Sequence, residues 1–179
     1  MGKTLGSWSG MRKYLEQDML ADCLKKHVRY NCTTYVGMDG CKVFEIYIDN
    51  EMIKRFSLET VNTFFIQNGY KKNSEYHGTN EYWNDFTRLV DEIPISQRTE
   101  YTDEEFCEAL ERYRNQPILQ SIYSENPLER MFAIFDRRIG KRTLLNLKDS
   151  INKQPIWLQT FYNFRLLIEF SGEGIPLSK

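Results

Sequence analysis

The sequence predicts an α+β protein, with a three-stranded antiparallel meander near the N-terminus packed with a mainly helical C-terminal half. Two observations lead to this prediction. Apolar and polar residues alternate between residues 28 and 56, which is the period of half-buried strands. After residue 57 the apolar residues recur every three to four positions, and capping residues precede several of these segments, as in amphipathic helices.

A chain of 179 residues fits one domain that can bury its own core. We expect this single domain to span residues 1–171, with an α/β meander half at 1–90 and a helical half at 102–171. Residues 91–101 are the candidate linker between the halves. Residues 172–179 are expected to form a flexible tail.

The first helix is expected to be capped by Ser9 and to run to about Leu24, because apolar residues follow Ser9 at helical spacing. A strand follows over residues 28–36, where the hydrophobic period changes to two. Met38-Asp39-Gly40 then favours a three-residue hairpin loop, with Gly40 in the left-handed conformation.

The loop lengths predict the register of the meander. A three-residue loop places Cys32 opposite Ile46 on the core face. A two-residue turn at Asp49-Asn50 starts the third strand and pairs Glu45 with Lys54 on the outer face.

The helical segments carry clear start signals, and each predicted start combines a capping residue with a following apolar stripe. The helix after Asn126 is expected to continue until Gly140, which would be its C-cap. The start signals are Ser57, Thr102 with Glu105 three residues later, Asn126-Pro127 and Pro155.

Composition limits the classes of partner. The 24 Lys and Arg residues nearly balance the 25 Asp and Glu residues, so the chain as a whole does not attract nucleic acid or anionic lipid. No apolar segment is long enough for a membrane span, and the N-terminus does not look like a secretory signal. The four cysteines form no metal-binding or disulfide pattern. We therefore expect a cytoplasmic protein with free thiols, no membrane contact, no metal and no cofactor.

Several sequence pieces carry a family likeness. The chain resembles an uncharacterised family of small bacterial cytoplasmic proteins with an N-terminal Trp-Ser before a helix and a late Asp-Arg-Arg-hydrophobic-Gly-Lys-Arg box. The resemblance implies a cytoplasmic α+β protein and implies no activity. The matching pieces are Trp8-Ser9, residues 24–35, Asn126-Pro127-Leu128, Asp136-Arg137-Arg138-Ile139-Gly140-Lys141-Arg142, Gln154-Pro155-Ile156-Trp157-Leu158 and Phe161-Tyr162.

The late box allows two interpretations. In the functional one, Arg130, Arg137, Lys141 and Arg142 form an anion site for a phosphate or an acidic partner surface. In the structural one, these cations offset the dipole at the C-terminus of a helix that ends at Gly140. We favour the structural interpretation, because cations at a helix end need no ligand to explain them.

Aromatic residues supply the second candidate surface, since aromatic side chains and arginine are enriched at protein interfaces. Arg29, Tyr35 and Tyr47 fall on the outer face of the predicted meander. Trp157 and Tyr162 lie on different sides of the last helix, which is therefore either central to the domain or paired with another subunit. The competing interpretation is that most of these aromatic residues are buried in the core.

Three hypotheses for the function follow. The leading one is a non-catalytic binding or interaction protein with a protein partner, for which a second copy of the chain is one candidate. The alternative is a nucleic-acid or phosphate-ligand binder that uses the basic box at residues 130–142. The third is an enzyme of unknown reaction with an acid and His27 or His77, although neither histidine has a second metal ligand at a helpful spacing.

Overall fold

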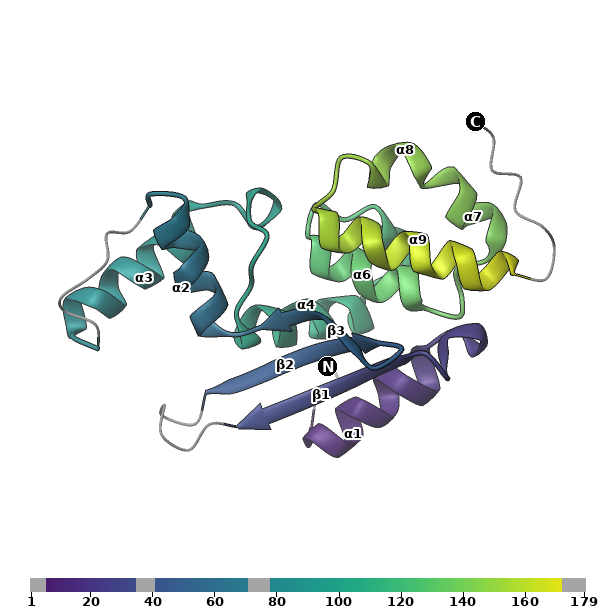
Figure 1. Ribbon diagram of the computed structural model, residues 1–179, viewed down its shortest axis with the longest axis horizontal. Helices are drawn as coiled ribbons and strands as arrows, with labels where there is room; N and C mark the ends of the chain where they lie inside the picture. Colours follow the sequence, from purple (N-terminus) through teal and green to yellow (C-terminus); the bar gives the residue numbers. More distant parts are fainter. Residues whose placement is uncertain (1–5, 35–40, 71–77, 172–179) are drawn as a thin grey trace.

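The computed structural model describes residues 6–34, 41–70 and 78–171, and it confirms the predicted α+β class (Figure 1). A three-stranded antiparallel sheet lies near the N-terminus, with the strand order β1-β2-β3. Helices precede and follow this sheet. The elements are α1 (Trp8–Lys13), β1 (Val28–Thr34), β2 (Lys42–Ile48), β3 (Glu51–Phe56), α2 (Leu58–Gln67), α3 (Asn80–Glu92), α4 (Asp103–Asn115), α5 (Ile118–Ile122), α6 (Pro127–Phe135), α7 (Lys141–Asn146), α8 (Lys148–Ile151) and α9 (Ile156–Phe170).

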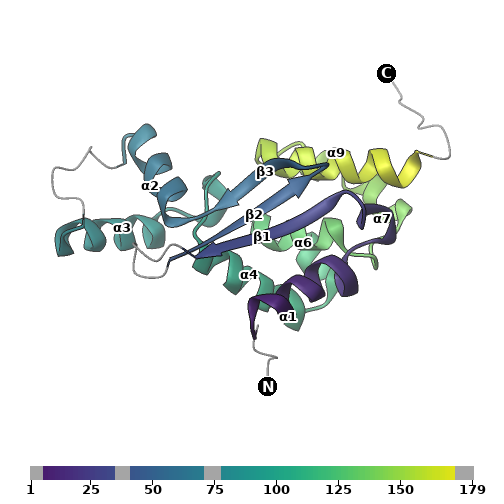
Figure 2. The same cartoon turned by 60° about the horizontal axis from the view of Figure 1, so that its bottom comes forward.

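One face of the sheet is covered by helices, and the strands lie in front of α4 and α6 in Figure 2. The ring of Phe106 on α4 stacks on Phe44 of β2 at 4.6 Å and lies 4.9 Å from Phe56 of β3. Phe132 of α6 lies 5.3 Å from Phe106. Aromatic contacts therefore join the sheet and the helical layer in one core.

The first helix begins at Trp8 and is capped by Ser7, whose side chain accepts a hydrogen bond from the backbone N–H of Gly10. It is shorter than predicted, because the chain changes to a π-helical turn at Tyr14–Met19. From this turn, Glu16 accepts a hydrogen bond at 2.8 Å from the backbone N–H of Tyr30. The carboxylate thus satisfies a backbone donor on the edge strand β1.

The predicted register of the first hairpin is wrong by two residues, since Cys32 pairs with Phe44. The last pair of this hairpin that the structure describes is Thr34 with Lys42. Met38-Asp39-Gly40 itself lies outside the described residues. A shift of two residues keeps every side chain on its predicted face, because side chains alternate with a period of two.

The second hairpin confirms the predicted two-residue turn, and Asp49 and Asn50 both have positive φ values, of 48° and 72°. Beyond the turn, a bulge shifts the register by one residue, so that Lys54 pairs with Ile46. The predicted pairing of Lys54 with Glu45 is therefore wrong. A bulge of one residue moves the following side chains to the opposite face, which brings Lys54 to the core side of the sheet.

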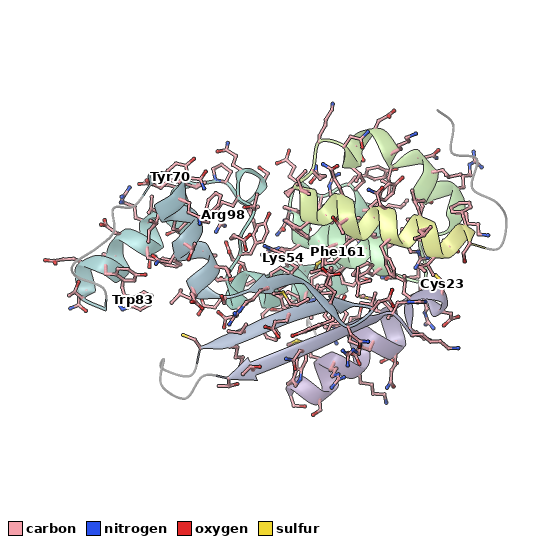
Figure 3. All side chains as sticks on the ribbon, viewed as in Figure 1. Cys23, Lys54, Tyr70, Trp83, Arg98 and Phe161 are labelled. Carbon is pink, nitrogen blue, oxygen red and sulfur yellow. The ribbon has the colours of Figure 1, made fainter. Side chains whose placement is uncertain are left out.

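Lys54 is buried where the sheet meets the helical half (Figure 3), with 5% of its surface exposed. Its ammonium group donates to Glu100 at 2.6 Å and to the carbonyl of Thr99 at 2.8 Å, and it lies 5.7 Å from the Trp157 ring centroid. Burial lowers the pKa of Lys54, while the nearby Glu100 carboxylate opposes that effect. Lys54 therefore anchors residues 99 and 100 against the sheet.

The end of the segment predicted as a linker is anchored by buried side chains, although several of its other residues are exposed. Arg98 is buried and pairs with Glu105 of α4, and the Tyr101 hydroxyl donates to the carbonyl of Arg98 at 2.5 Å. The backbone N–H of Ser57 donates to the carbonyl of Tyr101 at 3.0 Å. These contacts attach residues 98–101 to both the sheet and α4.

Helices α2 and α3 form a separate small core to the side of the main body (Figure 1). Ser57 caps α2, and Gly69 follows its end with a φ of 72°, as the sequence predicts. The helix pair therefore projects from the end of β3. Its buried apolar residues are Val61, Phe65, Phe86, Leu89 and Ile93.

Tyr30 provides a test of the core at alkaline pH. Its hydroxyl is buried and has no hydrogen-bond partner among the described residues, and burial raises its pKa. Above pH ~10 the unfolded chain releases this proton while the folded chain retains it, so the free energy of unfolding falls as the pH rises. We expect Tyr30→Phe to leave stability at neutral pH unchanged or higher, and to weaken the alkaline loss.

Urea unfolding of the Tyr30→Phe variant at neutral pH and above pH ~10 measures both effects. Tyr123→Phe is the matched control, because Tyr123 is exposed. A loss of more than about 2 kcal/mol at neutral pH would contradict the description of the Tyr30 hydroxyl as buried and unpaired.

Candidate functional site

A groove of about 920 Å³ runs between the α2–α3 pair and the start of α4. It exists because α2 and α3 form their own core and stand away from the main body. This volume lies in the range of ordinary ligand pockets. The lining residues are Cys41, Lys42, Leu58, Trp83, Phe86, Thr87, Val90, Asp91, Thr102, Asp103, Glu104, Glu105, Cys107 and Glu108.

The wall formed by α2 and α3 is mainly apolar, with one acid, Asp91, near the end of α3. Trp83 is 38% exposed, and Figure 3 shows its side chain at the surface of α3. Its ring makes edge contacts with Tyr82 at 5.0 Å and Phe86 at 6.1 Å. Leu58 and Val90 are half-buried beside this cluster. The wall therefore offers a large aromatic side chain that is held by its neighbours and open to solvent.

The opposite wall is acidic and comes from the first turns of α4. Thr102 and Glu105 form the predicted capping box, and Glu105 also pairs with Arg98. Asp103 accepts a hydrogen bond at 3.2 Å from the backbone N–H of Lys42. Carboxylates in a first turn stabilise the helix dipole, which accounts for Asp103, Glu104 and Glu105 without a ligand.

Two further carboxylates in the groove have no role in that first turn. Glu108 lies one turn further along α4, and Asp91 lies across the groove near the end of α3. Both are exposed. Lys42 is the lining residue that carries a positive charge. Arg98 pairs with Glu105, and Arg112 lies 3.5 Å from Glu108. The three other lining carboxylates, Asp91, Asp103 and Glu104, still outnumber Lys42, which gives the groove a negative potential.

The cysteine thiols are poor candidates for nucleophiles. Burial raises the pKa of Cys107, beside the groove, to about 11 and that of Cys23 to about 11, and it also raises the pKa of Cys32. These three thiols therefore stay protonated at neutral pH, whereas a nucleophile reacts as the thiolate. Cys41 is also free, so the four cysteines form no disulfide.

The basic box does not lie on a helix that reaches Gly140, so that prediction is wrong. Helix α6 ends at Phe135, Asp136 is its C-cap and Gly140 is the N-cap of α7. One distant contact and one local contact fix the backbone where the helix ends. The backbone N–H of Arg137 donates to the carbonyl of Met19 at 2.9 Å, and the Asp136 carboxylate accepts from the backbone N–H of Arg138 at 2.6 Å.

The four predicted anion-binding residues make separate contacts. The Arg130 guanidinium donates to the backbone carbonyls of Ser124 and Tyr123 at the end of α5. The Lys141 ammonium lies 5.2 Å from the Phe170 ring centroid. Arg137 and Arg142 are exposed.

The predicted partner-surface residues divide between surface and core. Arg29 lies 5.8 Å over the Tyr47 ring on the open face of the sheet, whereas Tyr35 lies outside the described residues. Trp157 is partly buried against the main core, and Tyr162 is 3% exposed. Packing in the core therefore explains Trp157 and Tyr162, whereas Ile156 and Leu167 of the same helix are exposed.

Of the two histidines, the structure describes His27. His27 lies 2.6 Å from Asp49 through its Nδ1 atom, at the half-exposed start of β1, and His77 falls outside the described residues. In the part of the chain that the structure describes, no three His, Cys, Asp or Glu side chains gather closely enough to hold a metal ion.

The sheet, its helical cover and the lateral α2–α3 pair define an α+β protein with an acidic and aromatic groove. Residues 7–166 match the model of the SF0329 protein family, and the chain belongs to this family. No curated protein and no solved structure matches the chain. Among the described residues, no helix combines the length and the apolar character needed to cross a bilayer.

The sequence did not reveal the groove as a site. Its acidic residues have the positions of ordinary helix-start signals, and Trp83 lies on a predicted amphipathic helix. Glu108 lies beyond the turn that the helix dipole explains, but Arg112 four residues later accounts for it as an ordinary ion pair on the helix. Its position opposite Trp83 depends on how the α2–α3 pair folds back toward α4.

Proposed function

We propose that this protein is a non-catalytic binding protein that holds a basic, amphipathic segment of a protein partner in the groove between α3 and α4. The observation that carries the proposal is the exposed Trp83 opposite a row of carboxylates across a groove of about 920 Å³. We also propose that it acts in the cytoplasm, where four free thiols remain reduced.

The two walls would recognise two features of such a segment. Apolar side chains of the partner would cover Trp83, Val90 and Leu58, and burial of an aromatic anchor commonly dominates the affinity of an interface. Lysine or arginine side chains of the partner would face Asp91, Glu104 and Glu108. Complementary charge of this kind favours association and selects against acidic partners.

The same charge disfavours nucleic acid as the occupant of this groove, because phosphates would face carboxylates. A second copy of the chain remains one candidate protein partner. Sedimentation mass over a range of protein concentrations would identify self-association, and binding of a peptide to the monomer would show that the groove acts without it.

The test uses a fluorescent synthetic peptide with leucine and lysine at helical spacing, measured by anisotropy. We expect the triple variant Asp91→Asn, Glu104→Gln and Glu108→Gln to weaken binding about tenfold, because exposed ion pairs each contribute up to about 1 kcal/mol. Glu111→Gln is the control, since Glu111 is an exposed acid of α4 outside the groove. Its affinity should equal that of the unchanged protein.

Replacing Trp83 with alanine tests the apolar wall. We expect a loss of affinity of about tenfold or more, as for an aromatic anchor at the centre of an interface. Leu119→Ala is the control, because Leu119 is exposed and lies outside the groove. Equal binding of a peptide with glutamate in place of lysine, or full affinity in Trp83→Ala, would refute the proposal.

A further inference from the structure

A second and smaller cleft, of about 270 Å³, is lined in part by the turn that follows α6. Three segments that are distant in sequence meet there: the π-helical turn after α1, the C-terminal end of α4, and the Asp136-Arg137-Arg138 turn. π-helical turns are rare and often occur at functional sites. The lining residues are Tyr14, Asp18, Met19, Arg114, Asp136, Arg137 and Arg138.

One residue that lines the cleft, Asp136, is a buried acid whose negative charge is already compensated by neighbouring side chains. Asp136 is 1% exposed and accepts hydrogen bonds from the Tyr113 hydroxyl and from the Arg138 guanidinium, the latter at 2.7 Å. Burial and the Asp136 charge raise the pKa of Tyr113, so its hydroxyl remains a donor. Arg138 and Tyr113 therefore provide the hydrogen bonds that the Asp136 carboxylate needs, and the other arginines of the cleft are not required for this.

The two remaining arginines form no ion pair with a carboxylate among the described residues. The Arg114 guanidinium stacks 4.7 Å over the Tyr14 ring, which fixes its position. Arg137 is exposed, but its backbone is fixed by the hydrogen bond to Met19. Asp18, also exposed, is the one other carboxylate that lines the cleft. The Arg114 guanidinium is held against Tyr14, whereas the exposed Arg137 side chain extends from a fixed backbone, so both retain donors for a ligand.

We propose that Arg114 and Arg137 bind the phosphate group of a small phosphate monoester in this cleft. Planar guanidinium groups match phosphate oxygens in paired hydrogen bonds, and two of them suit a group with two negative charges. The volume suits one phosphoryl group with a small organic body rather than a polymer. This site shares Arg137 with the predicted anion set and replaces Arg130, Lys141 and Arg142 with Arg114.

The two surfaces lie toward opposite ends of α4, which runs from Asp103 at the groove to the turn that carries Arg114. The anion site is therefore independent of the proposed groove function. Variants of Glu104 and Glu108 should bind phosphate normally, and variants of Arg137 should bind the basic peptide normally.

Calorimetric titration with inorganic phosphate and with glycerol phosphate, at constant ionic strength set by sodium chloride, tests the proposal. We expect both probes to bind, with glycerol phosphate at least as tight, and Arg137→Gln and Arg114→Gln each to weaken binding about tenfold or more. Arg142→Gln is the control, because Arg142 is an exposed arginine of the same box outside the cleft. It should bind both probes unchanged.

Three results would overturn the proposal. These are no heat of binding with either probe, equal weakening of binding in Arg142→Gln, or a heat of binding for sodium chloride equal to that for phosphate. Tighter binding of single-stranded oligonucleotide than of glycerol phosphate would reject the small ligand in favour of a nucleic acid. Urea unfolding of Arg137→Gln without phosphate should match the unchanged protein, which separates a binding role from a structural one.

Discussion

Replacing Phe132 with alanine is expected to lower the free energy of unfolding by about 3–5 kcal/mol. Phe132 is fully buried, and its ring lies 5.3 Å from Phe106 and 5.5 Å from Tyr113. It therefore connects α6 to α4, which in turn contacts the sheet through Phe106. Alanine would leave a cavity at the junction of the layers. Urea unfolding at neutral pH measures the loss.

The control for this prediction is Leu119→Ala, which should change stability by less than about 0.5 kcal/mol because Leu119 is exposed. Phe132→Leu should give an intermediate loss, since leucine fills part of the cavity. A loss below about 1 kcal/mol for Phe132→Ala would mean that the aromatic contacts do not unite the sheet and helices in one core.

The second large effect is expected at Asp136, where replacement by alanine should cost about 3 kcal/mol. The carboxylate accepts hydrogen bonds from the Tyr113 hydroxyl and the Arg138 side chain and backbone. Its loss leaves the buried Tyr113 hydroxyl without this acceptor, whereas Arg138, 51% exposed, can be hydrated. Thermal and urea unfolding at neutral pH measure the change.

Asp18→Asn is the matched control for Asp136→Ala, because Asp18 is an exposed acid that lines the same cleft. Its replacement should leave stability nearly unchanged. If the two substitutions had equal and small effects, Asp136 would not be the acceptor that fixes the end of α6.

Local sequence signals predicted the fold class and many helix starts. Alternating apolar residues identified the sheet, and the capping box at Thr102 fixed the start of α4. The register failed where it depended on features without a local signal. The bulge near Ile53 turned Lys54 inward, and its burial is compensated by Glu100, a residue distant in sequence.

The sites were less predictable than the elements, because distant segments form them. The apolar stripe suggested that α6 continues to Gly140, but the backbone contact between Met19 and Arg137 ends it earlier. That early end separates Arg137 from Arg130 and brings it to the same cleft as Arg114. Periodicity along one segment carries no information about such a contact.

The most direct test of the proposed function is to map the binding site of the leucine–lysine peptide on the ¹⁵N-labelled protein by amide chemical shifts. The proposal predicts that the largest changes fall around Trp83, Glu104 and Glu108, with little change near Arg137. Changes centred instead on the open face of the sheet, around Arg29 and Tyr47, would show that the groove is not the docking surface.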